Sequence, residues 1–120
     1  MQDHEKRRAE RRNFTYYMRV TDAASGVLIG HLVDISPNGF QLDCGKALPI
    51  GKEFRLYLDL TGEISNKSSI TFSARSVWIR PDPLDPTNYK VGFQVLVMGS
   101  NDAAIFYRMF ENYASLKPKR

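Results

Sequence analysis

The feature of this chain that most constrains its fold is a regular alternation of polar and apolar residues in two segments. Residues 53–60 alternate throughout, and residues 70–79 alternate with a change of phase at Val77 and Trp78. A period of two places successive side chains on opposite faces of a β-strand, so that one face meets a core and the other meets solvent. Both segments therefore predict β-strands, and the change of phase predicts a β-bulge.

Turn-forming residues divide the chain into further segments of the same kind. Gly, Pro, Asn and Asp favour turns at 22–26, 37–39 and 49–52. We expect the polar residues 61–69 to form a loop, and the proline-rich residues 81–86 to be irregular, because proline cannot extend a strand ladder. The predicted fold is all-β, a six-stranded antiparallel β-barrel that hides its sheet edges. Its expected strands are 14–20, 27–35, 39–44, 53–60, 70–79 and 89–98.

A single C-terminal α-helix is expected after the barrel. Ser100 or Asn101 can cap its start, and Pro118 closes its end. The helix should pack on the barrel or on a second copy of the chain, so a homodimer remains an open interpretation. Its apolar stripe consists of Ile105, Met109, Tyr113 and Leu116, widened by Phe106 and Phe110.

The chain of 120 residues is long enough for one domain with one core. We divide it into an arginine-rich flexible arm over residues 1–13, a barrel over 14–98, and a helix and tail over 99–120. No apolar run is long enough to span a membrane, and the first residues do not form a secretory signal. The single cysteine, Cys44, fits a reducing cytoplasm and is expected to be a small core residue.

The residues that usually carry catalysis or bind metals are poorly placed for either. His4 and His31 lie far apart, with no cysteine or carboxylate at ligand spacing. No nucleophile lies in a recognisable motif, and no pair of acidic residues stands out. We therefore expect no metal, no cofactor and no enzymatic activity, and we expect Trp78 to lie in the core or at the barrel rim.

Positive charge is concentrated at the N-terminal end. The first twenty residues contain six Lys or Arg and three acidic residues, whereas the whole chain has a net charge of only +4. A protein that binds long nucleic acids usually spreads its basic residues over a whole face. A focal cluster suits a small polyanion better, because guanidinium groups fit phosphate oxygens, or the O6/N7 edge of guanine, two at a time. The cluster consists of Arg7, Arg8, Arg11 and Arg12.

A second polar motif, Asp34-Ile35-Ser36-Pro37-Asn38-Gly39, follows between two predicted strands. Taken alone, it is explained by an Asx or Ser turn that needs no ligand. Its functional interpretation assigns the guanine N1–H and N2–H donors to the Asp34 carboxylate, with a further contact from the Ser36 hydroxyl. Together with the arginine cluster, this motif favours a guanine nucleotide with exposed phosphates.

At these residues the chain resembles the PilZ family, bacterial receptors for the second messenger cyclic di-GMP. That family has an Arg-x-x-x-Arg motif, often preceded by another Arg, and then an Asp/Asn-x-Ser-x-x-Gly motif. Arg8 and Arg12 match the first pair, with Arg7 before it, although a register with Arg7 and Arg11 also fits. Residues that match the second motif are Asp34, Ser36 and Gly39. The resemblance covers nearly the whole chain, including the barrel and the terminal helix.

The resemblance implies a role for each matching residue. Arg8 and Arg12 would hold phosphate and the Hoogsteen edge of guanine, and Arg7 would stack on or pair with the ligand. Asp34 and Ser36 would read the guanine, and Gly39 would shape the loop. An arginine before the motif is similar to the family variant that takes an intercalated ligand dimer, which implies two ligands per chain. Further candidates for ligand contact are Arg11, Asn38 and Gly92.

The expected function is a cytoplasmic cyclic di-GMP receptor in which the ligand orders the N-terminal arm and the signal passes to an unidentified protein effector. A ligand-independent adaptor of the same family is the main alternative. A nucleic-acid-binding barrel is a weaker one, because Tyr16, Tyr17 and Arg19 are the only aromatic and basic residues interleaved on a predicted strand.

Overall fold

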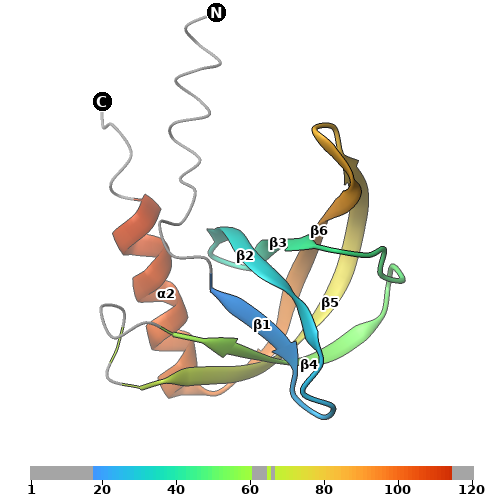
Figure 1. Cartoon of the computed structure of the whole chain (residues 1–120). Coiled ribbons are helices and arrows are strands. Elements are labelled where there is room, and N and C mark those ends of the chain that lie inside the picture. The colour runs from blue at the N-terminus through green and yellow to red at the C-terminus, as the bar shows by residue number, and fades with distance from the viewer. Residues whose placement is uncertain (1–17, 61–64, 66, 115–120) are drawn as a thin grey trace, which may run out of the picture.

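Six antiparallel strands close into a barrel, in the order β1-β2-β3-β6-β5-β4, with one helix beside it (Figure 1). This computed structural model describes residues 18–60, 65 and 67–114. The six-stranded antiparallel barrel with a C-terminal helix confirms the predicted fold class. The elements are β1 (Arg19–Asp22), β2 (Leu28–Ser36), β3 (Gly39–Cys44), β4 (Glu53–Asp59), β5 (Ser69–Asp82), β6 (Asp85–Met98) and α2 (Ser100–Ala114).

The short strand β1 closes the barrel, because it pairs with β2 on one side and with β4 on the other. Val20 is the Cα partner of Gly30 in β2 and of Leu58 in β4. β1 overlaps the predicted strand 14–20 at Arg19 and Val20, and it then continues through Thr21 and Asp22, which pair with β4. Residues 14–17 and the predicted arm over residues 1–13 lie outside the described residues.

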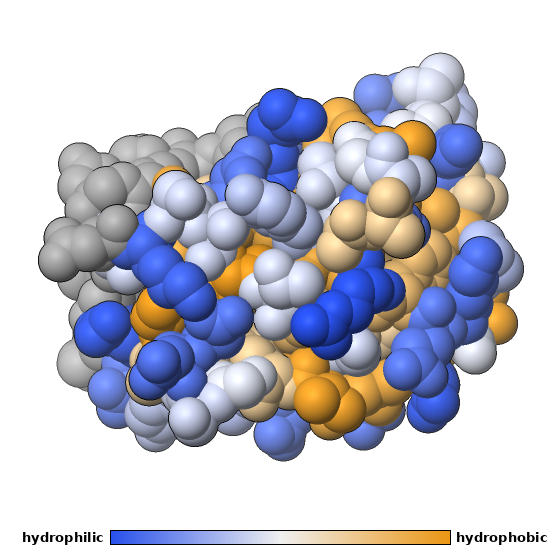
Figure 2. All heavy atoms as spheres, turned by 90° about the horizontal axis from the view of Figure 1, so that it is seen from below, coloured by the Kyte–Doolittle hydropathy of each residue, from blue (hydrophilic) through white to orange (hydrophobic). Residues whose placement is uncertain are grey.

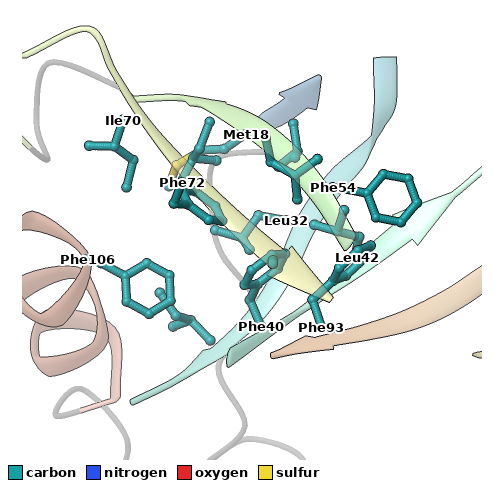
Figure 3. Packing of buried hydrophobic residues seen from close by; sticks show 14 of the residues in the cluster. Met18, Leu32, Phe40, Leu42, Phe54, Ile70, Phe72, Phe93 and Phe106 are labelled. Carbon is teal, nitrogen blue, oxygen red and sulfur yellow. The ribbon is translucent and has the colours of Figure 1, made fainter. Parts of the chain in front are cut away.

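The core of the barrel is built from the inward residues of the alternating strands (Figure 3). Phe40 lies at its centre: its ring stacks on Phe93 at 5.1 Å between centroids and meets Phe72 edge-on at 5.5 Å. Edge-to-face and offset-stacked pairs are the favoured aromatic arrangements. Cys44 is fully buried, and burial raises the pKa of its thiol to about 12. It is therefore a core residue, as predicted.

The predicted β-bulge in β5 is confirmed. Ser76 pairs with Phe93 and Trp78 pairs with Gly92, so Val77 is an extra residue between two consecutive pairs. Ser76 is fully buried, and Val77 is exposed. The bulge thus shifts the alternation by one residue, which explains the change of phase in the sequence.

The expectation that residues 81–86 form an irregular loop is wrong. β5 continues to Asp82 and β6 starts at Asp85, so that the two strands form a hairpin that extends beyond the barrel (Figure 1). Pro81 pairs with Tyr89, and the ladder is irregular next to it. β5 pairs with β4 only from Ser69 to Arg75, so beyond Arg75 one side of β5 is a sheet edge. Proline is tolerated at such an edge, because no neighbouring strand needs its N–H there.

The helix α2 packs on the barrel through its apolar stripe. Ile105, Phe106 and Met109 are buried, and the Phe106 ring lies 6.4 Å from that of Phe40. The predicted caps Ser100 and Asn101 lie in the first turn instead, because the Gly99 carbonyl accepts the first helical bond, from the Ala103 N–H. The side chain of Tyr113, and residues Leu116 and Pro118, lie outside the described part.

Asp102 ties the first turn of α2 to the barrel. Its carboxylate accepts a hydrogen bond of 3.2 Å from the backbone N–H of Thr71 in β5, and it pairs with Lys67. Burial opposes the charged form of this group, but the contacts with Lys67 and Thr71 outweigh it and lower the pKa of Asp102. The ionised carboxylate therefore stabilises the docked helix.

We expect Asp102→Asn to lower the free energy of unfolding at pH 7 by about 1 kcal/mol, because Lys67 is half exposed and its pairing is partly screened. Because the pKa of Asp102 is lower in the folded than in the unfolded state, its carboxylate stabilises the fold fully above the unfolded pKa of about 3.9. This stabilisation is lost as the pH falls through the folded pKa. The difference between the variants should therefore shrink in acid. Urea unfolding between pH 2 and pH 7 measures it, with the exposed Asp59→Asn as control. An equal difference at all pH values would contradict the assignment.

Candidate functional site

Four strands carry one row of neighbouring residues on the outer face of the barrel. Asp34 of β2 pairs with Gln41 of β3, Gln41 with Gly92 of β6, and Gly92 with Trp78 of β5. The adjacent row, which includes Phe40 and Phe93, points into the core, so this row points outward. Because neighbouring strands lie about 4.8 Å apart, the row spans roughly 14 Å of surface.

A shallow cavity of about 190 Å³ lies over this row. It brings together four of the residues proposed from the sequence, Asp34, Ser36, Gly39 and Gly92. Asn38 does not line the cavity. Its backbone carbonyl instead accepts a hydrogen bond of 3.0 Å from the Val95 N–H, which fastens the tip of the β2–β3 hairpin to β6.

The polar side chains of the hairpin also hold its turn. The Asp34 carboxylate accepts a hydrogen bond of 2.8 Å from the Ile35 N–H, and the Ser36 hydroxyl donates one of 3.3 Å to the Gly39 carbonyl. Both are short-range bonds to the backbone of the same turn, whereas in an Asx or Ser turn the side-chain oxygen would accept from the N–H two residues further on. The Ser36 hydroxyl gives its proton in its bond to the Gly39 carbonyl, so its two lone pairs keep acceptor capacity for a ligand.

Close packing, rather than an unusual backbone angle, requires glycine at both Gly39 and Gly92. The positive-φ glycines among the described residues are Gly26 and Gly51. A Cβ on Gly39 would lie 2.3 Å from the backbone carbonyl oxygen of Phe93. Gly39 is not one of the positive-φ glycines, and the absence of a side chain there instead lets β3 approach β6 closely.

Trp78 covers Gly92 and forms one wall of the cavity. A Cβ on Gly92 would lie 2.1 Å from the Trp78 Nε1 atom, so the indole rests directly on the glycine. The Arg80 guanidinium lies 4.6 Å from the centroid of the indole ring, within the range of a cation–π contact. Trp78 is half-buried and belongs to the site, a role for which its expected place in the core or at the rim gave no hint.

Sequence reasoning missed Trp78, Arg80 and Gln41 as site residues. The change of phase at Val77 was the signal for Trp78, because a bulge there turns the indole outward. Gln41 could be found only from the pairing of β2 with β3, which places it opposite Asp34. The proposed arginines, Arg7, Arg8, Arg11 and Arg12, lie outside the described residues.

An ionic cluster supports the protruding part of the β5–β6 hairpin beside the site. The Lys90 ammonium contacts the Asp82 carboxylate at 2.9 Å and that of Asp43 at 3.3 Å. Burial disfavours the charged lysine, but the bonds to Asp82 and Asp43 prevail and raise the pKa of Lys90. The Lys90 hydrogen bond in turn lowers the pKa of Asp82. Because Lys90 pairs with Arg80 across the ladder, the cluster helps to fix the strand that carries Arg80 and Trp78.

The described residues contain no group of three or more His, Cys, Asp or Glu side chains that could hold a metal ion. Over the same residues, no helix has both the length and the apolar character needed to cross a membrane. The polar and aromatic groups that line the cavity include a carboxylate, a hydroxyl, an amide and an indole.

This geometry defines a small β-barrel protein with a polar and aromatic cavity on the outer face of its sheet. A model of the PilZ domain matches residues 5–111, which is most of the chain. The chain belongs to the PilZ family. Comparison with curated proteins gives no match.

Two solved structures with the same fold each align over more than four fifths of this chain. The inhibitor of motility of Bacillus subtilis (MotI/DgrA) is 16% identical, with a TM-score of 0.63 over 87% of this chain and 48% of that chain. The PilZ domain of YcgR from Escherichia coli, solved with c-di-GMP, is 16% identical, with a TM-score of 0.62 over 82% of each chain.

A third structure, the PlzA protein of Borreliella burgdorferi in complex with c-di-GMP, is 11% identical. Its TM-score is 0.52, over 98% of this chain and 50% of that chain. The present chain thus spans about half the length of MotI and of PlzA. At these identities the likeness concerns the fold.

The two site glycines should respond differently to substitution by alanine. In Gly39→Ala the new methyl group meets backbone, which cannot move aside, so we expect a loss of about 2 kcal/mol or more in unfolding free energy. In Gly92→Ala it meets the Trp78 indole, which can be displaced. Because Trp78 is the only tryptophan, its fluorescence should then shift to longer wavelength.

Gly45→Ala is the matched control, because a Cβ there meets no atom within 4 Å. Thermal unfolding and emission spectra of the three variants make the comparison. If the spectrum of Gly92→Ala equals that of the wild type, the indole does not rest on Gly92.

Proposed function

We propose that this protein is a receptor for cyclic di-GMP. The observation that carries the proposal is the grouping of Asp34, Ser36 and Gly39 with Trp78 around one cavity, in a chain of the PilZ family. The structures of the YcgR PilZ domain and of PlzA were both solved with this ligand, which supports the same ligand class here.

In this proposal the Asp34 carboxylate accepts hydrogen bonds from N1–H and N2–H of a guanine, and the Ser36 hydroxyl adds a further contact. The two donor nitrogens are both bonded to C2 of the base, and this spacing matches the two oxygens of one carboxylate. Hydrogen bonds to a charged group contribute about 1.5–3 kcal/mol each. Gly39 keeps the hairpin tip close to β6 and so holds both acceptors in place.

Trp78 and Arg80 extend the proposed site beyond the residues expected from the sequence. The indole forms a wall of the cavity that Asp34 also lines. It therefore offers an aromatic surface beside the base, and Arg80, stacked at 4.6 Å, adds a positive charge close to the phosphates. Base–aromatic stacking contributes about 1–3 kcal/mol per base. Gly92 is required because any side chain would displace the indole.

The arginine cluster supplies the phosphate contacts in this proposal. Arg8 and Arg12, with Arg7 before them, would fold over the cavity when ligand binds, and Arg11 is the alternative partner in the shifted register. Ordering the arm costs conformational entropy, which charge-assisted contacts to phosphate must offset. The ordered arm would present a new surface to a protein effector, and two intercalated ligands per chain are the proposed stoichiometry.

Substitution of residues that are proposed to bind phosphate or guanine tests the receptor function. We expect Arg8→Ala, Arg12→Ala and Asp34→Ala each to weaken cyclic di-GMP binding about tenfold or more, because each removes a charge-assisted contact. Titration calorimetry measures the affinity and also the number of ligands per chain. Arg108→Ala, on the exposed face of α2, is the control and should bind normally.

The same titrations separate the alternatives. A wild-type protein that shows neither heat nor a change in melting temperature with cyclic di-GMP would be a ligand-independent adaptor. Preferred binding of a single-stranded oligonucleotide in competition would instead indicate a nucleic-acid-binding barrel.

A lower affinity for cyclic di-GMP is also expected for Trp78→Leu, which keeps an apolar side chain but removes the aromatic surface. Its affinity should fall about fivefold to a hundredfold, in line with the stacking of one base. Its unfolding free energy, measured in urea, separates lost stacking from lost folding. An unchanged affinity in a folded Trp78→Leu protein would remove Trp78 from the site.

A further inference from the structure

A second and larger cleft lies at the other end of the β2–β3 hairpin. Its volume is about 700 Å³, against about 190 Å³ for the cavity near Asp34, and the two share no lining residue. It is bordered by the start of β2, by residues 45–49 after β3, and by Lys52 and Phe54 at the start of β4. A volume of this size falls within the usual range of small-molecule sites.

The walls of this cleft are mainly apolar. Leu48 and Phe54 are nearly buried on its inner side, whereas Val27 and Leu28 stay 54% and 43% exposed at its border. The exposed apolar surface of these two side chains adjoins the concave wall, so a ligand in the cleft would cover it. Apolar surface also appears between hydrophilic side chains on the face seen from below (Figure 2).

One wall is held rigidly by a buried hydroxyl group. Ser76 of β5 is fully buried, and its hydroxyl donates a hydrogen bond of 2.6 Å to the Pro49 carbonyl and accepts one of 3.2 Å from the Lys52 N–H. The Gly51 N–H donates to the Ser76 carbonyl at 2.7 Å. These bonds fix the loop before β4, so the cleft is preformed rather than opened by a ligand.

Positive charge exceeds negative charge among the residues that line the cleft. Lys46 and Lys52 line it, and neither forms an ion pair with another described residue. The Lys52 ammonium lies 5.3 Å from the Phe54 ring centroid and so sits directly above the apolar wall. The acidic lining residue, Asp43, is already bonded to Lys90 at 3.3 Å and to the Asn88 amide at 2.6 Å. The cleft therefore offers positive charge beside an apolar surface.

We propose that this cleft binds a small amphiphilic anion, a molecule with an apolar body and one anionic head group. The apolar body covers Val27, Leu28 and Phe54, and the head group pairs with Lys46 and Lys52. A preformed concave site with a few polar groups at its border is typical of small-molecule sites, whereas protein interfaces are broader and have a polar rim. This site is separate from the cyclic di-GMP site and does not depend on it.

Titration of the ¹⁵N-labelled full chain with sodium decanoate, below its micelle concentration, tests the proposal. We expect saturable shifts of the amide signals of residues 27–31 and 45–54, and little change at 34–41. Decyltrimethylammonium, which has the same chain length and the opposite charge, should not bind. Cyclic di-GMP should not compete with decanoate, so this result stays distinct from the outcome of the receptor test.

Two variants with matched controls locate the site. The double variant Lys46→Glu/Lys52→Glu should weaken decanoate binding about tenfold or more, because a charge-assisted contact becomes a repulsion. Its control is Arg55→Glu/Arg108→Glu, at exposed positions outside the cleft. Leu28→Ser should also weaken binding, whereas Leu84→Ser, at the 92% exposed hairpin tip, should not.

Several results would overturn the proposal. These are a linear, unsaturated response, equal binding of the cationic amphiphile, and shifts spread over other exposed apolar residues such as Val97 and Tyr107. Unchanged affinity in a Lys46→Glu/Lys52→Glu protein with a native amide spectrum would do the same.

Discussion

One extra residue in β5 decides how the outer face of this barrel is used. Ser76 lies inside, paired with Phe93, and the bulge at Val77 turns Trp78 outside, paired with Gly92. Without it, strict alternation would place the indole in a core that the phenylalanine cluster already fills. Ser76 follows the regular alternation of β5 and fixes the loop before β4, and the bulge after it gives the barrel a half-buried aromatic wall beside Asp34.

The two glycines complete this arrangement through the space that they leave. Gly92 makes room for the indole, and Gly39 makes room for the backbone of β6 at the tip of the hairpin. Interiors packed to this density do not tolerate an added methyl group without a shift of their neighbours. The carboxylate of Asp34 and the indole of Trp78 line one cavity, and in the row between them Gly92 leaves the space that the indole fills. The α2 helix packs on the core beneath this row, because its Phe106 ring contacts that of Phe40.

Most of the barrel was predictable, because alternation and turn residues act over short distances. The six strands and the C-terminal helix appear in the predicted order, and the bulge is where the phase changes. The β5–β6 hairpin was mispredicted, because proline is excluded from a strand only where its N–H would have to bond to a neighbouring strand, and the pairing of β5 with β4 ends at Arg75, before Pro81. The predicted cap of α2, Ser100 or Asn101, lies one or two residues too far along the chain, because the Gly99 carbonyl accepts the first helical hydrogen bond.

The sequence by itself determined the class of fold and the polar motif from Asp34 to Gly39, since both depend on neighbouring residues. Only the tertiary structure decided that Gln41, Gly92 and Trp78 lie in one row with Asp34, because the pairing of four strands brings together residues up to about sixty positions apart. It also decided that residues 27–31, 45–49 and Lys52 enclose a second cleft. Such neighbourhoods follow from strand register and barrel closure, which no local pattern of residue types specifies.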